Sequence, residues 1–355
     1  MKSTPTPSLY LYLFLLLVSL GCTGDGSEET GIYSPAPIAG TQITPPQILD
    51  PVVTPQPANT ITLAGTLTSQ PALTRTPPIQ PTPTSWASCS FHISHLSGNF
   101  YLSRPIAPPG RDYIDPTYRF GATQHGQREP HTGVEFLNST GTPILAAANG
   151  QVIFAGNDLD VLQSAWPNFY GNLIILEHSL PNMEMPLFTL YAHLSDIHVA
   201  VGDQVEAGQV IGLVGASGSA EGSHLHFEVR LGENHYTNTQ NPELWLRPHS
   251  SIEGISYGAM AARLLDENGY PINIGEVVVE TYVNEGETPV KYILEMYDWE
   301  EMGDSQPILE EHTALGDLPP GRYRFTFVYN GLKEQFFEVH SGEVTYLTIC
   351  LDTGQ

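Results

Sequence analysis

Short apolar runs bounded by glycine and other turn residues recur from about residue 90, without a long amphipathic helical period between them. Clear examples are residues 150–156, 172–178 and 209–215. β-Branched residues suit a pleated strand, and glycine permits the tight turns between antiparallel strands. The pattern predicts a mainly β protein, with an antiparallel β-sheet or barrel-sandwich core over 90–249 and a small β-sandwich over 250–355.

The second β region rests on its own turn and strand signals. Asp266-Glu-Asn-Gly269 is a turn signal, and residues 276–283 follow as a strand. After Pro320-Gly321, aromatic residues alternate from Tyr323 to Tyr329 with the period of a strand. The Leu-Pro-Pro-Gly-x-Tyr segment resembles transthyretin-like, carboxypeptidase-regulatory-like modules, which implies an accessory module. A spacer or stabilising role is expected for it, because its sequence holds no catalytic constellation.

The N-terminal segment is expected to be a targeting signal. After Lys2 comes an uncharged apolar run, Leu9 to Leu20, followed by Gly21-Cys22. Its length suits a secretory h-region but is too short for a helix that spans a bilayer. The ending resembles a bacterial lipobox, although Ser19 stands where Leu is usual, and this implies a signal peptide over 1–22 and a lipidated Cys22. Ordinary signal cleavage and an uncleaved anchor are the alternatives. Each places the protein outside the cytoplasm, in the cell envelope.

Residues 23–88 are expected to be a disordered tether. This stretch holds 12 Pro and 13 Thr among 66 residues, with few charges. Such a composition cannot bury enough apolar surface to offset the entropy of ordering. The predicted arrangement is a folded region held away from a membrane, to which the lipid on Cys22 attaches it.

The charge of the chain excludes one class of partner. Thirteen Lys and Arg against 38 Asp and Glu give a formal net charge of −25. Nucleic-acid binding depends on a basic surface that displaces counterions from phosphates, so no nucleic-acid partner is expected.

The spacing of histidine and glutamate residues indicates a metal site. His131 and Glu135 are four residues apart, and His224 and His226 are two apart. On strands, side chains two or four apart share a face, so each segment would present two ligand-type side chains together. Two His and one carboxylate with an open fourth position make up a catalytic zinc site. An isolated His-x-His is common, however, and carries little weight without its surroundings.

Those surroundings resemble the lysostaphin-type metallopeptidases, the LytM-like domains of peptidase family twenty-three. The resemblance covers roughly residues 119–232 and implies a β core that cuts peptide bonds of peptidoglycan with one zinc ion per chain. The segments that carry it, in the family's order, are His131-Thr-Gly-Val-Glu135, Gly141-Thr-Pro143, Tyr170-Gly-Asn172, Tyr191-Ala-His193-Leu194, Val201-Gly-Asp203 to Gly212, and Gly222-Ser-His224-Leu-His226-Phe-Glu228.

The resemblance also implies roles for single residues. His131 and His226 match the first and last zinc ligands, and Glu135 stands where the family has Asp. His224 and His193 match the histidines that act on the zinc-bound water and the transition state. Tyr170 matches, more loosely, a tyrosine that stabilises the oxyanion.

Two other functions compete with a peptidase. The segment from Val201 to Gly212 resembles a lipoyl- or biotinyl-type carrier, because both have tight Gly turns between short strands. Such carriers need a target lysine, and none occurs between Lys2 and Lys291. A catalytically degenerate module that recruits or activates a cell-wall hydrolase stays open, because Glu135 departs from the family pattern.

The cysteines allow one disulfide in the folded part of the chain. Apart from Cys22, only Cys89 and Cys350 are present. They flank the two expected β regions, and an extracytoplasmic compartment would permit them to pair. Whether their Cα atoms come within reach cannot be read from sequence.

Overall fold

The computed structural model describes residues 89, 91–159, 161–180, 183–298, 302 and 309–352. The expected signal segment with Cys22 and the expected tether over 23–88 lie outside these residues. The described residues belong to a compact unit over 78–355. Within them, no helix is long and apolar enough to cross a membrane.

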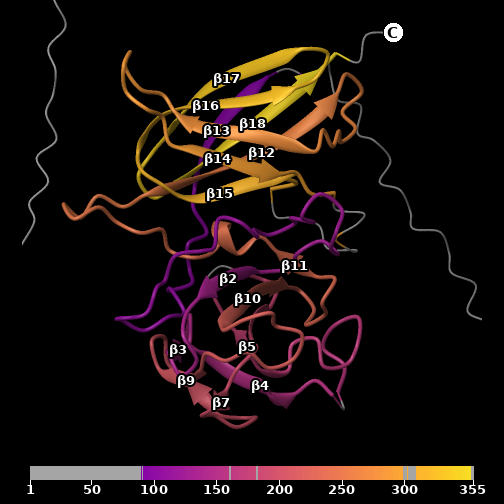
Figure 1. Ribbon diagram of the computed structural model, residues 1–355, viewed down its shortest axis with the longest axis vertical. Helices are drawn as coiled ribbons and strands as arrows, with labels where there is room; N and C mark the ends of the chain where they lie inside the picture. Colours follow the sequence, from indigo (N-terminus) through magenta and orange to yellow (C-terminus); the bar gives the residue numbers. More distant parts are fainter. Residues whose placement is uncertain are drawn as a thin grey trace, which may run out of the picture. The chain divides into compact units, whose positions relative to one another are not determined.

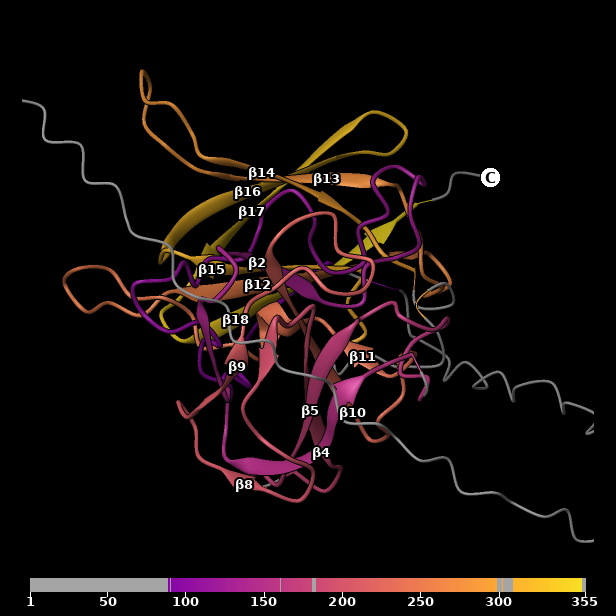
Figure 2. The same ribbon diagram turned by 60° about the horizontal axis from the view of Figure 1, so that its bottom comes forward.

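The first group of strands builds a large antiparallel sheet (Figures 1 and 2). The strand order in it is β11-β10-β6-β5-β4-β8, and β2 pairs with β10. A smaller antiparallel sheet has the order β3-β9-β7. The strands of the large sheet are β2 (Val134–Leu137), β4 (Gly150–Asn157), β5 (Asn172–His178), β6 (Leu187–Ala192), β8 (Gln204–Val205), β10 (His224–Leu231) and β11 (Thr239–Gln240). Those of the smaller sheet are β3 (Pro143–Leu145), β7 (Asp196–Ile197) and β9 (Val210–Leu213), and a 3₁₀ helix, η1 (Pro242–Leu244), follows β11.

The central strands are apolar on both faces because the large sheet has a core on each side. Along β5, Ile174 and Leu176 pack into one cluster, whereas Leu173 and Ile175 pack into the other. Successive side chains of a strand point to opposite faces, so this alternation follows from the backbone. It explains why residues 172–178 read as an uninterrupted apolar run. The prediction of a mainly β core is confirmed.

The second group of strands forms two facing sheets, β1-β18-β12-β15 and β14-β13-β16-β17. Tyr323, Phe325 and Phe327 of β16 point into the core between them, together with Met260 and Leu347 from the other sheet. The expected sandwich is therefore present. Its strands are β1 (His92–Ser97), β12 (Gly258–Asp266), β13 (Glu276–Thr281), β14 (Lys291–Glu295), β15 (Thr313–Leu318), β16 (Gly321–Val328), β17 (Leu332–Val339) and β18 (Glu343–Leu351).

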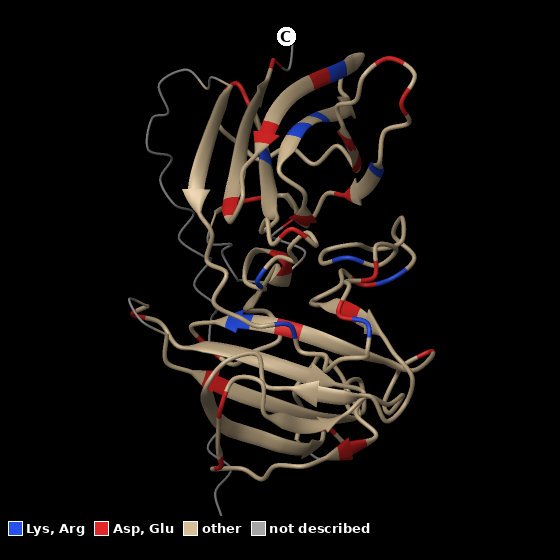
Figure 3. Ribbon diagram, turned by 90° about the vertical axis from the view of Figure 1, so that its left-hand side faces the viewer, with Lys and Arg blue, Asp and Glu red and all other residues tan. Residues whose placement is uncertain are grey.

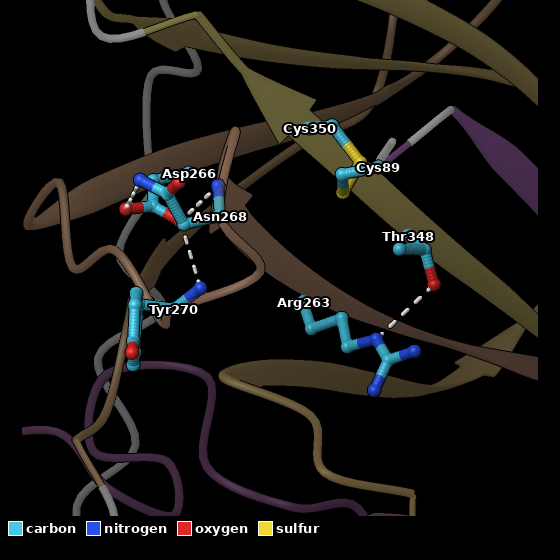
Figure 4. The surroundings of a disulfide bond; sticks show 7 residues. All are labelled: Cys89, Arg263, Asp266, Asn268, Tyr270, Thr348 and Cys350. Carbon is cyan, nitrogen blue, oxygen red and sulfur yellow. Dashed lines mark hydrogen bonds between the residues drawn. A yellow bond between two sulfur atoms is a disulfide. The ribbon is translucent and has the colours of Figure 1, made fainter. Parts of the chain in front are cut away.

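Strand β1 belongs to this sandwich although it precedes the first group of strands in the chain. It pairs antiparallel with β18, with His95 opposite Thr345. Cys89 and Cys350 are joined by a disulfide at this place, with their Cα atoms 5.6 Å apart (Figure 4). The start of the described chain is thus fastened to its last strand. The domain division at residues 249 and 250 stays a prediction.

Acidic residues are distributed over both groups of strands, and the fewer basic residues lie among them (Figure 3). Several arginines form ion pairs inside the fold. Arg104 pairs with Asp317 at 2.6 Å, Arg119 with Glu243 at 2.5 Å and Arg230 with Glu228 at 2.8 Å. Asp317 lies in β15, so the first of these pairs joins the segment between β1 and β2 to the sandwich.

Candidate metal centre

Three ligand-type atoms meet in a buried triangle. His131 Nε2 lies 2.9 Å from Glu135 Oε1 and 3.2 Å from His226 Nδ1. The third edge, from His226 Nδ1 to Glu135 Oε1, is 3.0 Å. Glu135 in β2 and His226 in β10 are direct register partners, so strand pairing sets this edge.

The sequence argument for His131 was wrong in one respect, since this residue does not share a strand with Glu135. Strand β2 begins at Val134, and His131 lies in the loop before it. Gly133 lets this loop approach β10 closely. A Cβ at Gly133 would lie 2.5 Å from the carbonyl oxygen of Phe227 and 2.9 Å from the imidazole of His226. Loop geometry, rather than strand periodicity, brings the first histidine to the triangle.

The triangle fits a zinc ion. Ligand atoms at 2.0–2.2 Å in a tetrahedral arrangement lie about 3.3–3.6 Å apart, so the observed edges would lengthen by a few tenths of an ångström around the ion. The other carboxylate oxygen of Glu135, Oε2, is buried without a hydrogen-bond partner among the described residues. His224 Nε2 lies 3.0 Å from it, outside hydrogen-bond geometry. A buried carboxylate left in this state is expected to bind a cation, and the longer Glu side chain reaches the triangle.

Both histidines of the triangle have their remaining ring nitrogen held in place. His131 Nδ1 lies 3.2 Å from the carbonyl oxygen of Arg119, which can only accept a hydrogen bond. His226 Nε2 lies 3.1 Å from Glu228 Oε1. Each contact can hold the ring proton on the outer nitrogen, so the inner nitrogen is the one that would bind a metal in place of its present contact with Glu135.

Two further histidines stand beside the triangle. His224 lies two residues before His226 on β10, and its Nδ1 is 2.9 Å from the carbonyl oxygen of Gly222. His193 follows β6, and its Nδ1 is 2.9 Å from the carbonyl oxygen of Ser217. Their ring centroids are 4.8 Å apart. In both residues the backbone carbonyl fixes the tautomer, so Nε2 is the nitrogen available to exchange a proton.

Burial and neighbouring charge set the protonation of the site. Burial, with the charges of His226 and His224, lowers the pKa of His193 to about 3, so its imidazole is neutral near pH 7. Burial acts to raise the pKa of Glu135, but His226 and the hydrogen bonds of the surrounding histidines outweigh it and hold this pKa well below its usual range. The site therefore offers a carboxylate and a neutral imidazole together.

Tyr170 lies next to the site in a buried network. Its hydroxyl donates to Glu228 Oε1 at 2.5 Å and accepts from Arg230 at 3.1 Å. Thr132 donates to the same oxygen of Glu228 at 2.6 Å. The tyrosine proton is thus directed to a buried carboxylate, an arrangement that favours a positioning role. The oxyanion role expected for Tyr170 stays a prediction.

Sequence reasoning missed Glu228 and Arg119. Glu228 continues the two-residue period of His224 and His226 along β10, so its place on the same strand face could have been inferred. The contribution of Arg119 is a backbone carbonyl, which any residue carries, and the sequence therefore holds no signal for it. The structure does bring together five of the residues predicted for the site: His131, Glu135, His193, His224 and His226.

A cavity of about 690 Å³ opens beside the triangle. Tyr118 stacks on the ring of His131, with centroids 3.9 Å apart. Arg128 lies over Tyr118 and pairs with Glu221 at 2.8 Å. This volume lies within the range of ligand-binding clefts, about 300–1,000 Å³. Its lining includes Tyr118, Arg128, His131, Trp166, Tyr170 and Tyr236.

A second group with ligand-type atoms lies at the surface of the sandwich and consists of His95, His340 and Glu343. The two imidazole rings stack 4.1 Å apart at an angle of 12°. Nearly parallel rings cannot both direct their in-plane lone pairs to one ion. This group therefore lacks the convergent geometry of the buried triangle.

Comparison with known proteins matches the part of the chain that contains the triangle to a peptidase family. Residues 129–240 match the description "Peptidase family M23". Glycyl-glycine endopeptidase ALE-1 of Staphylococcus capitis is 31% identical over 145 residues, which are 40% of this chain and 34% of the relative. Murein hydrolase activator NlpD of Escherichia coli is 35% identical over 111 residues, covering 31% of this chain and 24% of the relative.

Among solved structures, a zinc-containing peptidase from Vibrio cholerae is 31% identical, with a TM-score of 0.30 and coverage of 38% of each chain. The chain spans about a third or less of the length of the two curated relatives. The family match covers all five residues of the cluster, His131, Glu135, His193, His224 and His226. Residues 129–240 therefore form a lysostaphin-like domain of peptidase family M23.

Proposed function

We propose that the protein is a zinc-dependent endopeptidase that hydrolyses peptide bonds of peptidoglycan. The observation that supports this best is the buried triangle of His131, Glu135 and His226, with edges of 2.9–3.2 Å. Glycyl-glycine endopeptidase among the relatives supports the reaction class. A zinc ion, when bound, lowers the pKa of a coordinated water and polarises a carbonyl.

The residues of the chain would divide the remaining chemistry. His224 is proposed as the general base, because its Nδ1 is fixed on Gly222 and its Nε2, 3.0 Å from Glu135 Oε2, faces the triangle where the attacking water would lie. The proton then passes to the leaving amine, while the hydroxyl group becomes part of the new carboxylate. The structure does not favour an oxyanion-stabilising role for His193, because its ring proton lies on Nδ1 against Ser217 and its neutral Nε2 has no proton to donate. We propose instead that His193 Nε2 accepts a hydrogen bond from the attacking water and orients it.

The alternative is a module that binds peptidoglycan or a hydrolase without cutting. It has one specific support, since the relative NlpD is described as a murein hydrolase activator. Loss of catalysis would be expected to remove some of the histidines. In this chain all four histidines are present and cluster with Glu135, which favours the peptidase.

The location of the protein is also proposed. We expect Cys22 to be lipidated and to anchor the chain to a membrane in the cell envelope, with residues 23–88 as the tether. Mass spectrometry of the mature N-terminus tests this. An unmodified Cys22, or cleavage at another position, would contradict it.

The experiment that separates ligands from proton-transfer residues uses matched histidine variants of the full chain. His226→Ala should lose both zinc and activity. His224→Ala and His193→Ala should keep zinc but reduce turnover about 10²- to 10⁴-fold. His340→Ala, in the surface group, should change neither. Retention of zinc and turnover in His226→Ala would reject the proposed site.

A further inference from the structure

We infer that the β-sandwich positions the metal ligand His131, through residues 119–123, and so forms part of the metal site. This inference rests on the metal site of the proposed function. It gives the sandwich a specific task that a spacer would not have. Three independent contacts between the sandwich and this segment support it.

The first contact comes from the end of strand β14. Glu295 Oε2 accepts hydrogen bonds from the backbone nitrogen and the hydroxyl of Thr123, each at 2.9 Å. It also accepts from the backbone nitrogen of His125 at 3.4 Å. One carboxylate of the sandwich thus fixes both the backbone and a side chain of the loop that leads to His131.

The second contact is made by the ring of Tyr297, just after β14. Gly121 lies against this ring with a φ of +76°, and a Cβ there would approach the Cδ1 of Tyr297 to 2.4 Å. Phe120 meets the same ring edge-on, with centroids 5.3 Å apart. Only glycine permits both the close approach and the left-handed backbone at this position.

The third contact runs through a buried carboxylate. Arg119 donates to Glu243 Oε2 at 2.5 Å, and the backbone nitrogen of Gly316 in β15 donates to the same oxygen at 2.7 Å. Glu243 is only 3% exposed. A charge at this depth requires such partners, so Arg119 and β15 are held together by it.

The same short segment makes the contacts that hold His131. The carbonyl oxygen of Arg119 is 3.2 Å from His131 Nδ1. The backbone nitrogen of Gly121 donates to the carbonyl oxygen of His131 at 2.8 Å, and the backbone nitrogen of His131 donates to that of Ala122 at 3.1 Å. Ring orientation and backbone position of His131 are therefore both set by residues that the sandwich fixes. Glu295 is a positioning residue in this arrangement, because it acts through Thr123.

The test compares Glu295→Ala and Glu295→Gln with a control in the same sandwich. Glu280→Ala in β13 removes ion pairs to Lys291 and Arg324, and none of the contacts described for Glu280 involves residues 119–131. For each full-length variant, zinc affinity is measured by competition with a chelator. Hydrogen exchange of residues 119–131 is measured in the zinc-free protein, and urea unfolding reports overall stability.

We expect Glu295→Ala to weaken zinc binding about tenfold, within the range known for residues that orient metal ligands. The amides of Gly121 and His131 should exchange faster in this variant. Glu295→Gln keeps an acceptor for Thr123 and should recover part of both effects, and Glu280→Ala should change neither.

Two results would overturn the inference: unchanged exchange and zinc affinity in Glu295→Ala, or equal losses in Glu280→Ala. If the unsubstituted protein binds no zinc, the proposed metal site fails, whereas the exchange data still decide whether the sandwich holds this segment.

Discussion

Glu135 and His226 face each other across the β2–β10 pair, as register partners whose Oε1 and Nδ1 atoms lie 3.0 Å apart. Strand pairing thus fixes the distance between the two side chains that we propose as metal ligands. His131 completes the triangle from a loop. The strand pair provides a rigid edge, and the loop provides the remaining corner.

Shortening the carboxylate should harm this site. Glu135→Asp withdraws the carboxylate by one methylene from a triangle whose backbone is set by strand pairing. We expect zinc affinity to fall about tenfold or more, since a ligand held out of reach contributes little. The measurement is chelator competition on the full chain.

The matched control for this change is Glu177→Asp, the same substitution at an exposed position of β5. It should leave zinc affinity unaltered. If Glu135→Asp instead binds zinc more tightly and gains activity, the native site is a degenerate one, and the binding-module alternative would be favoured.

Removing the charge of Glu228 should affect stability and metal binding together. Glu228→Gln leaves the buried guanidinium of Arg230 without its counter-charge and weakens the acceptor for His226 Nε2. We expect the free energy of unfolding to fall by about 3 kcal/mol and zinc affinity to fall about tenfold. Urea unfolding and chelator competition measure the two effects. An unchanged zinc affinity in a folded variant would show that Glu228 does not orient His226.

Strand patterns predicted much of the fold because they depend on local chemistry. Residues 150–156 and 172–178 became β4 and β5, and the aromatic alternation from Tyr323 became β16. The pairing of β1 with β18 could not be predicted in this way. It joins segments about 250 residues apart, and β1 itself is too short and polar to indicate its partner.

The site was predictable where a side chain acts and unpredictable where the backbone does. His224 and His226 were found from their two-residue spacing and do share a strand. The histidine tautomers are fixed by the backbone carbonyl oxygens of Arg119, Gly222 and Ser217. Every residue has such an oxygen, so the sequence cannot predict these contacts. The contact of Glu295 with Thr123 depends on how the two β regions pack, which local patterns do not contain.

The interaction between His249 and Asp317 should make stability depend on pH. The hydrogen bond to Asp317 raises the pKa of His249 above its ordinary value of 6.5. Burial would raise the pKa of Asp317, but the hydrogen bond of His249 and the charge of Arg104 lower it below 3.8. Asp112 also faces His249, at 3.1 Å.

The raised pKa of His249 stabilises the fold at pH values below the ordinary histidine pKa of 6.5, and this stability is lost as pH rises through the pKa of the folded state. The lowered pKa of Asp317 stabilises the fold at pH values above the ordinary Asp pKa of 3.8, and this stability is lost as pH falls through the pKa of the folded state. We therefore expect the difference in unfolding free energy between the native chain and His249→Gln to be greatest between these values. Urea unfolding from pH 4 to 9 measures it. A difference that grows above pH 7 would contradict the assignment.

The disulfide should stabilise the fold by limiting the unfolded chain. Cys89 and Cys350 are separated by 261 residues, so the bond closes a long loop. We expect Cys350→Ser to lower the free energy of unfolding by roughly 2–4 kcal/mol. Peptide mapping without reduction should find the two cysteines in one linked peptide. Free thiols at both positions in the purified protein would exclude the bond.

The central claim is that the triangle of His131, Glu135 and His226 makes this chain a zinc-dependent peptidase. The most direct measurement incubates the purified full chain with peptidoglycan and identifies the released fragments by mass, in three states: as purified, after zinc chelation, and after zinc is restored. We predict fragments with newly exposed peptide termini, their loss on chelation, and their return with one zinc per chain. A protein that holds one zinc per chain yet releases no fragments, or that cuts equally well after chelation, would contradict the account.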